Sequence, residues 1–311
     1  MTLTPVLIAI APIFLLIILG HLLRRNGIPN IEFWNMNDRL VYWVLMPALL
    51  FYKTSTIELT PGLVGSYSVV IIGGFLAALA FGIGSARLAE LPNDQASSVM
   101  QGAARHNAFI ALSIAGGLFG AEGLSLGALA MALLIPVTNL TVVPLMVIMN
   151  KKDTGSGVFA MVLRDLARNP LLVSVLIGVG FNVSGIGEVP VLHDTTKLIG
   201  NAALPIVLMC VGANLRLRAM QTSALPLALS ITGKFLIFPV ITVILAKLLG
   251  LSELETLVAL LFTASPTASA SYTLARQMGG DAPLMAAITT IQTALAFLTL
   301  PLSLLVVEQL F

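Results

Sequence analysis

The chain has 311 residues, of which 58% are hydrophobic and only 10% are charged, and its mean hydropathy is +1.00. A soluble domain carries about 45–50% apolar and about 25% charged residues, so this composition excludes a soluble protein and indicates an integral membrane protein. A net charge of +2 is too small for a nucleic-acid-binding surface. A single cysteine, Cys210, excludes an internal disulfide and a zinc cluster, and we expect neither a metal nor a cofactor.

Ten apolar segments follow one another along the chain, each close to the roughly 20 residues that a membrane-spanning helix needs. They lie at Leu3–Leu23, Asp38–Thr56, Leu63–Ala89, Ala96–Phe119, Gly123–Met149, Pro170–Gly187, Lys197–Leu215, Ala224–Leu249, Glu255–Met278 and Ala282–Val307. No basic segment precedes the first one and no obvious cleavage site follows it, so we expect a retained helix rather than a signal peptide. The sequence therefore predicts an all-α membrane protein with ten transmembrane helices.

Basic residues flank these segments unevenly on the two sides. Eleven belong to one set of alternate loops: Arg24, Arg25, Arg39, Arg87, Lys151, Lys152, Arg164, Arg168, Arg216, Arg218 and Arg276. The other set contains only Lys53, Lys197 and Lys247. Because Lys and Arg of short loops stay on the cytoplasmic side, we predict a multi-pass protein of the inner membrane with both termini in the periplasm.

A polar linker at residues 150–169 divides the ten segments into a first repeat, residues 1–149, and a second repeat, residues 170–311. Pro47 and Pro205 lie 158 positions apart in similar surroundings, and Pro144 and Pro301 are offset by 157. Because five spans per half is an odd number, the two repeats must be inverted relative to each other. Inverted repeats with interrupted helices are typical of secondary transporters.

Three basic side chains lie near the centres of predicted helices, whereas all fourteen acidic residues fall in loops or at helix ends. Arg105 and His106 are in the fourth helix and Lys234 is in the eighth. A charge at the bilayer centre costs about 2.5–3.5 kcal/mol on insertion scales, so such residues usually face the protein interior or an aqueous cavity. Two interpretations stay open: a binding site for an anion, or bonds to carbonyls that helix breaks leave free.

The ninth segment contains a proline, Pro266, followed by the hydroxyl residues Thr267 and Ser269 at mid-membrane depth. A proline removes a backbone donor, and irregular backbone survives at this depth only against protein or a water-filled cavity. The equivalent depth of the fourth segment holds Arg105-His106-Asn107. If both helices break there, two helix N-termini meet and favour an anion. Alternatively, the hydroxyls bond only to their own helix turns, and His106 either relays protons or forms hydrogen bonds within the break.

At these residues the sequence resembles the auxin efflux carrier family, in its bacterial branch of malate- and malonate-permease-like proteins. The strongest resemblance covers residues 264–281, with its Pro-Thr-Ala, Ala-Arg-Gln and Gly-Gly-Asp motifs. Residues 107–123, residues 199–215 and Lys234 with Pro239 also match, so the resemblance runs over nearly the whole chain. One departure is that Ala111-Leu112-Ser113 replaces a Gly and a Pro that family members often carry in the fourth helix.

The resemblance implies a ten-helix fold similar to that of the bile-acid/sodium symporters. In this fold helices 1, 2, 6 and 7 form a scaffold, and helices 3, 4, 5, 8, 9 and 10 form a transport domain in which the broken helices 4 and 9 cross. It also implies organic anions as substrates, a homodimer, and elevator-like alternating access.

We therefore predict a secondary transporter for a small organic anion, a mono- or dicarboxylate, bound where helices 4 and 9 cross. The predicted substrate-binding residues are Arg105, His106, Asn107, Lys234, Pro266, Thr267 and Ser269. Because no carboxylate lies within the spans to bind sodium or a proton, uncoupled efflux or exchange is favoured. A sodium- or proton-coupled symporter, and a channel or sensor with this fold, stay as alternatives.

Two further predictions concern polar residues inside the spans. An intramembrane serine hydrolase would combine Lys234 with Ser265, Ser269 or Ser271, but no nucleophile motif supports it, so we predict that the protein is not an enzyme. Hydrogen bonds between helices are expected from Asn139, Asn214 and Gln292.

Overall fold

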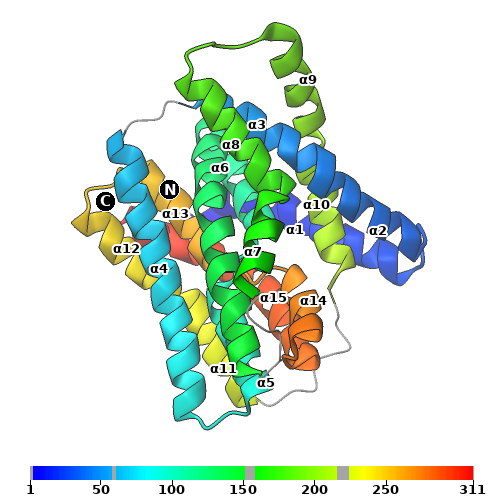
Figure 1. Ribbon diagram of the computed structural model, residues 1–311, viewed down its shortest axis with the longest axis vertical. Helices are drawn as coiled ribbons and strands as arrows, with labels where there is room; N and C mark the ends of the chain where they lie inside the picture. The colour runs from blue at the N-terminus through cyan, green and yellow to red at the C-terminus, as the bar shows by residue number, and fades with distance from the viewer. Residues whose placement is uncertain (1–2, 58–60, 151–157, 216–223, 311) are drawn as a thin grey trace.

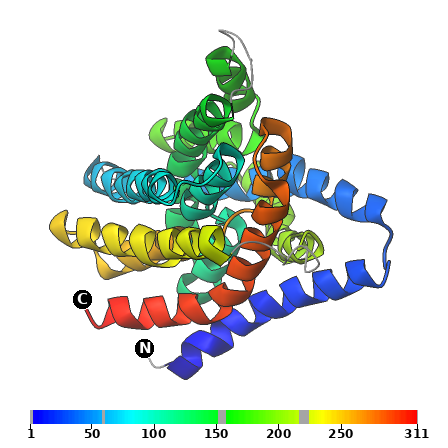
Figure 2. The ribbon, with the colours of Figure 1, turned by 90° about the horizontal axis from the view of Figure 1, so that it is seen from below.

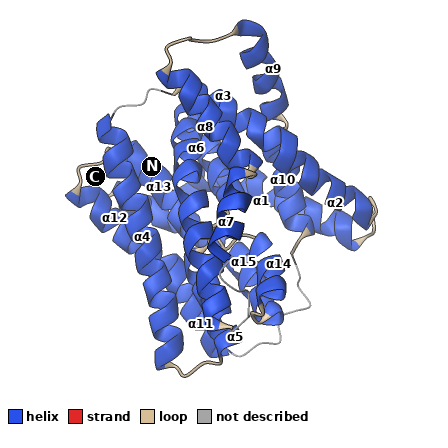
Figure 3. Cartoon of the chain, in the orientation of Figure 1, coloured by secondary structure: helices blue, strands red, loops and turns tan. Residues whose placement is uncertain are grey.

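The computed structural model describes residues 3–57, 61–150, 158–215 and 224–310. Within these ranges all regular secondary structure is helical and none is strand (Figure 3), which confirms the prediction of an all-α protein. Four basic residues used for the predicted orientation lie outside the described residues: Lys151, Lys152, Arg216 and Arg218.

The first half of the chain forms the following helices in order: α1 (Leu3–Arg25), α2 (Ile31–Leu40), the π-helical turn η1 (Val41–Leu45), α3 (Met46–Thr56), α4 (Pro61–Leu88), α5 (Asn93–Ala104) and α6 (Ala108–Met149). The second half forms α7 (Val158–Ala167), α8 (Pro170–Val183), α9 (Pro190–Asn201), α10 (Ala203–Ala213), α11 (Ala224–Thr232), the π-helical turn η4 (Gly233–Ile237), α12 (Phe238–Leu248), α13 (Glu253–Ala264), α14 (Ala270–Met278) and α15 (Ala282–Glu308).

Six helical stretches of the described chain are long and apolar enough to cross a membrane, and a seventh is added if the bent pair Ala160–Ala167 and Pro170–Val183 counts as one span. The chain is therefore a membrane protein with several spans. One stretch, Asn93–Met149, is 57 residues long, which is more than twice the length that one crossing needs. It is interrupted between α5 and α6, and again at Gly120, whose φ of 59° and ψ of −137° are not helical.

Other predicted segments consist of shorter helices. The segment Glu255–Met278 is divided into α13, of 12 residues, and α14, of 9 residues. The turns η1 and η4 precede Pro47 and Pro239, which stand near the starts of α3 and α12. Because proline has no N–H to donate to the preceding turn, the helix widens locally at both places.

The helices form two groups on either side of the long helix α6 (Figure 1). One group contains α1, α2, α3, α9 and α10, in which α1 packs along α10 and α3 packs along α9. α8 lies beside α3 and extends this group across α6. The other group contains α4, α11, α12 and α13, and Figure 2 shows α4 running beside α11 and α12. α1 and α15, which hold the two ends of the described chain, lie near each other in both views.

Small residues allow helix backbones in the first group to touch. A Cβ at Gly20 of α1 would meet the Met209 carbonyl of α10, and a Cβ at Gly212 of α10 would meet the Ile17 carbonyl of α1. Helices packed in lipid depend on such close approaches, because the surrounding chains are as apolar as the helices and supply no hydrophobic driving force. Packing of the α1–α10 pair therefore requires glycine at both positions.

The α3–α8 contact provides a direct test of this packing. A Cβ at Gly178 of α8 would meet the Thr54 hydroxyl and lie 2.9 Å from the Phe51 carbonyl oxygen. We expect Gly178→Val to lower the free energy of unfolding by about 1–3 kcal/mol through overpacking, measured as a loss of thermal stability in detergent. Gly180→Val is the matched control, since no described atom lies within 4 Å of a Cβ there. Equal melting temperatures for the two variants would contradict this account of the contact.

Candidate functional site

The chain leaves the helical conformation at both predicted midplane positions. α5 ends at Ala104 and α6 begins at Ala108, and the C-cap of α5, Arg105, is extended with a ψ of 140°. α13 ends at Ala264 and α14 begins at Ala270, with Pro266 between them. Proline forces the residue before it out of the helical region, and Ser265 is accordingly extended with a ψ of 148°. Ala111-Leu112-Ser113, the departure from the family pattern, lies inside α6 and is helical.

Asn107 connects the two breaks. Its side-chain oxygen accepts hydrogen bonds from the backbone N–H groups of Phe109 and Ile110, both at 3.2 Å, and so caps α6. Its own backbone N–H donates to the carbonyl oxygen of Pro266 at 2.7 Å. One residue therefore starts α6 and joins the first break to the second.

Thr267 and Gln292 form the other connection between the breaks. The Thr267 hydroxyl lies 2.7 Å from Gln292 Oε1 and 2.9 Å from the Gly102 carbonyl oxygen, and the Thr267 N–H donates to Gln292 Oε1 at 3.0 Å. Gln292 Nε2 donates to the Gly102 carbonyl and to the Ser230 hydroxyl, both at 3.0 Å. Four parts of the chain, α5, α11, the second break and α15, are thus held together by one fully buried amide.

The prediction of interhelical hydrogen bonds is confirmed for two of the three residues. Gln292 makes the bonds just described, and Asn214 donates from the end of α10 to the Asp38 carboxylate of α2 at 3.1 Å. The prediction is wrong for Asn139, whose amide donates to the Ile135 carbonyl of its own helix at 2.9 Å. The carbonyl four residues earlier on a helix is within reach of a short polar side chain, so a local bond replaces the distant one.

The three predicted basic residues surround the first break. Arg105 is half-buried, and its Nη1 lies 3.5 Å from Gln101 Oε1. His106 is buried, and its ring centroid lies 6.1 Å from that of Phe262 at the end of α13. Lys234 is fully buried in η4, with Nζ 4.7 Å from the centroid of the Phe238 ring. Gly233, the residue before Lys234, packs against Ala103 of α5, so η4 lies beside the last turn before the first break.

Several polar atoms around the first break are buried without a partner. Lys234 Nζ, His106 Nδ1 and Gln101 Nε2 have no hydrogen-bond partner among the described residues. A buried donor without an acceptor costs about 1–3 kcal/mol, and a charged one costs more, so Lys234 Nζ and Gln101 Nε2 indicate a missing acceptor. Sequence reasoning did not select Gln101, although its position one helical turn before Arg105 could have indicated it.

Two helix N-termini add to the positive potential. α6 begins beside Asn107 and α14 begins beside Ser269, and a helix N-terminus carries about half a positive charge. Ser269 is half-buried, and among the described residues its hydroxyl does not cap α14. The seven predicted residues do not all share one role. Asn107, Pro266 and Thr267 hold the two breaks together, whereas the side chains of Arg105, His106, Lys234 and Ser269 do not take part in the bonds that join the breaks.

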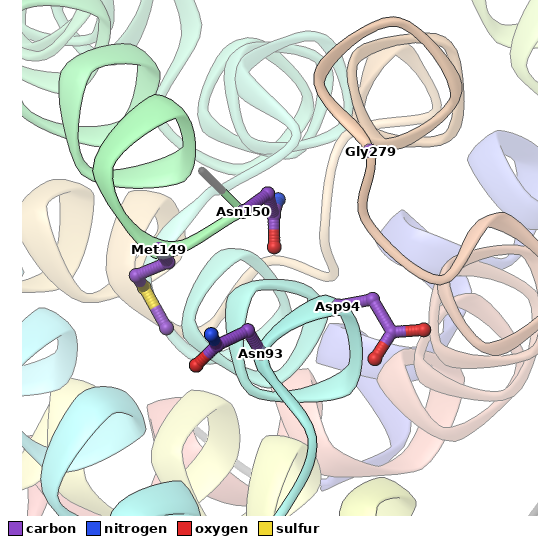
Figure 4. A pocket seen from close by; sticks show the side chains of 5 residues that line it. All are labelled: Asn93, Asp94, Met149, Asn150 and Gly279. Carbon is purple, nitrogen blue, oxygen red and sulfur yellow. The ribbon is translucent and has the colours of Figure 1, made fainter. Parts of the chain in front are cut away.

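A separate pocket of about 280 Å³ lies where the described chain approaches the linker. Figure 4 shows its lining: Asn93 and Asp94 from the first turn of α5, Met149 and Asn150 from the end of α6, and Gly279 after α14. None of the seven predicted residues lines it. Asn150 donates to the Met278 carbonyl at 2.9 Å and to the Ser97 hydroxyl at 3.2 Å, so the pocket is at a junction of helix ends and away from the breaks.

We expect Gln292→Leu to disrupt the connection between the breaks. The substitution leaves the Thr267 N–H without an acceptor and should lower the free energy of unfolding by about 1–3 kcal/mol, measured by thermal unfolding in detergent. Asn139→Leu also replaces an amide side chain with leucine, but only a bond within one helix is lost, and a smaller effect is expected. A Gln292→Leu variant as stable as the wild type would show that this network does not hold the breaks.

The chain is similar over nearly its whole length to known membrane transport proteins. Residues 5–304 match the family model described as "Membrane transport protein". An uncharacterized transporter of Methanothermobacter thermautotrophicus is 24% identical over 294 residues, which cover 93% of this chain and 94% of the relative. Another, from Methanocaldococcus jannaschii, is 21% identical over 300 residues, which cover 93% of this chain and 95% of the relative. The family predicted from the sequence is thereby confirmed: the chain belongs to the membrane transport proteins of the auxin efflux carrier family.

Proposed function

We propose that this membrane transporter carries a small organic anion, a mono- or dicarboxylate, and binds it beside the two helix breaks. The observation that carries the proposal is that two buried basic side chains, Lys234 and His106, have Nζ and Nδ1 atoms without a described partner, and that Arg105 precedes His106 in the first break. An anion would supply the missing acceptors and would also interact favourably with the N-termini of α6 and α14.

The positions of the carboxylates support an anion from outside the protein. In α5 and α13 the described acidic residues are in the first turn, as Asp94, Glu253 and Glu255. At 1.5 Å per residue, Asp94 lies roughly 15 Å along the helix from Ala104, so it cannot pair with the basic residues at the first break. The alternative, in which the basic groups serve carbonyls freed by the breaks, leaves Lys234 Nζ without the hydrogen bonds that such a role requires.

The fold that we propose for this function has ten spans in two inverted repeats, with α5–α6 and α13–α14 as the crossing broken helices. The packing of α1 with α10 and of α3 with α8 and α9 supports a scaffold made of the predicted helices 1, 2, 6 and 7. The Gln292 network supports a transport domain that moves as one unit, because it joins α5, α11, the second break and α15. Elevator-like movement of that unit, within a homodimer, completes the proposal.

The negative charge of the proposed substrate favours efflux over uptake. The interior-negative potential of an inner membrane favours efflux of an anion by about 2.3 kcal/mol per charge at 100 mV. Efflux or exchange therefore needs no coupling ion, and this agrees with the absence of carboxylates near the described breaks.

Replacing the side-chain amide of Asn107 with a carboxylate tests the proposed site. Asn107→Asp keeps the N-cap of α6, because Asp caps as well as Asn, but places a negative charge at the break. Two like charges about 6 Å apart at an effective dielectric constant of about 20 repel by about 3 kcal/mol, which corresponds to roughly 100-fold weaker anion binding. The expected result is a loss of that size in the uptake of labelled malate or malonate by proteoliposomes that contain the folded variant.

Asn169→Asp is the matched control. Asn169 caps α8 through the same two bonds, to the N–H groups of Leu171 and Leu172 at 3.0 and 3.3 Å, but it lies at the linker. The control should transport like the wild type. If Asn107→Asp keeps wild-type transport of every carboxylate that the wild type carries, the anion site is not at the breaks.

A further inference from the structure

Aromatic rings of α3, α8 and α9 gather near the C-terminal end of α3. The centroid of the Phe51 ring in α3 lies 5.6 Å from that of Phe181 in α8 and 5.5 Å from that of His193 in α9. Tyr52, the next residue of α3, has its ring centroid 6.3 Å from that of His193. These contacts between three helices hold the Tyr52 ring in place.

Two lysines place their ammonium groups over this ring. Lys53 Nζ of α3 lies 5.3 Å from the centroid of the Tyr52 ring, and Lys197 Nζ of α9 lies 5.8 Å from it. Lys53 is half-buried and Lys197 is exposed, and among the described residues neither forms an ion pair or a hydrogen bond. Two positive charges therefore meet at one aromatic ring without a described anion.

The polar groups of this helix junction bond to one another rather than to the lysines. Asn182 of α8 donates to the carbonyl oxygens of Ser55 and Ile57, at 3.1 and 2.6 Å, and so serves the C-terminal end of α3. His193 is 2% exposed, its Nδ1 accepts from the Val189 N–H at 2.9 Å, and its Nε2 lies 3.2 Å from the Ser55 hydroxyl. The junction is thus complete without the two ammonium groups, which stay available to a partner.

The lysines stand at the edge of an exposed apolar surface. Val191 and Leu198 of α9 are 80% and 73% exposed, and because they are seven positions apart they lie on one face of the helix. An exposed apolar face of a membrane protein contacts the acyl chains of lipids. Lys197 directly precedes Leu198, and a lysine beside such a surface extends its apolar stem along it and keeps its ammonium group among the headgroups.

The pair is unexpected on its side of the membrane. Only Lys53, Lys197 and Lys247 are predicted there, against eleven basic residues on the other side. Because basic residues are depleted on the side opposite the cytoplasm, the orientation of the chain does not explain why two of the three meet at one ring. An anion that both lysines bind gives a reason.

We propose that Lys53, Lys197 and Tyr52 form a binding site for the phosphate of an anionic phospholipid. The phosphate oxygens accept from both ammonium groups and offset the repulsion between them, while the acyl chains lie along the apolar face of α9. The bound lipid joins α3 to α9 within the helix group proposed as the scaffold. The proposal does not depend on the anion site at the helix breaks, which lies on other helices.

Native mass spectrometry of the detergent-purified protein, titrated with phosphatidylglycerol, tests this site. The wild type should bind phosphatidylglycerol more tightly than phosphatidylcholine, whose headgroup is neutral overall. Lys53→Gln combined with Lys197→Gln should weaken the tightest binding step roughly 30-fold, and Lys197→Gln alone, at an exposed position, about 5-fold. The double substitution to arginine keeps both charges and should bind like the wild type. Lys247→Gln is the matched control, because it removes the third lysine of the same predicted side from the last turn of α12.

Each outcome decides the proposal. A loss of binding confined to the glutamine variants of Lys53 and Lys197 supports it. Equal loss in Lys247→Gln overturns it, and so does wild-type binding by a folded double variant or, if that variant does not fold, by Lys197→Gln. Glycerol 3-phosphate that binds as tightly as the lipid would show a site for free phosphate instead. A smaller fraction of dimer in the double variant, with lipid binding unchanged, would assign the surface to a second copy of the chain. No transport is measured, so these results are independent of the Asn107→Asp assay.

Discussion

Backbone groups at the centre of a bilayer have no water to bond with, so an interrupted helix needs partners inside the protein. In this chain the two interruptions supply partners to each other. The Asn107 N–H donates to the Pro266 carbonyl, and Gln292 bonds both Thr267 on one break and Gly102 before the other. The ends of the four half-helices are thereby fixed relative to one another.

The same arrangement explains why buried basic residues are tolerated. Helix N-termini and C-termini meet at the breaks, so regions of positive and negative potential lie within a few residues of each other. Arg105 and His106 lie in the break between α5 and α6, whereas Lys234 lies in a neighbouring π-helical turn that packs against α5 and α13.

Sequence reasoning located the breaks because their causes are local. Pro266 removes a donor, Asn107 is a preferred capping residue, and charges in a run of apolar residues stand out. The partners of the breaks were harder to predict, since Gln292 reaches Gly102 across 190 positions and no periodicity indicates that pairing. Asn139 shows the opposite error, because a bond within its own helix replaced the expected distant one. The bounds of the helices were harder to predict where one apolar segment contains two short helices, as in α13 and α14.

The most direct test of an anion site at the breaks is hydrogen–deuterium exchange in lipid nanodiscs, with and without a saturating carboxylate that the protein transports. An anion held by the N-termini of α6 and α14 should slow exchange at residues 106–110 and 267–271, which surround those N-termini. Exchange in the first turn of α5, at residues 93–96 beside the separate pocket, should not change. Protection confined to residues 93–96, with none at either break, would contradict the account.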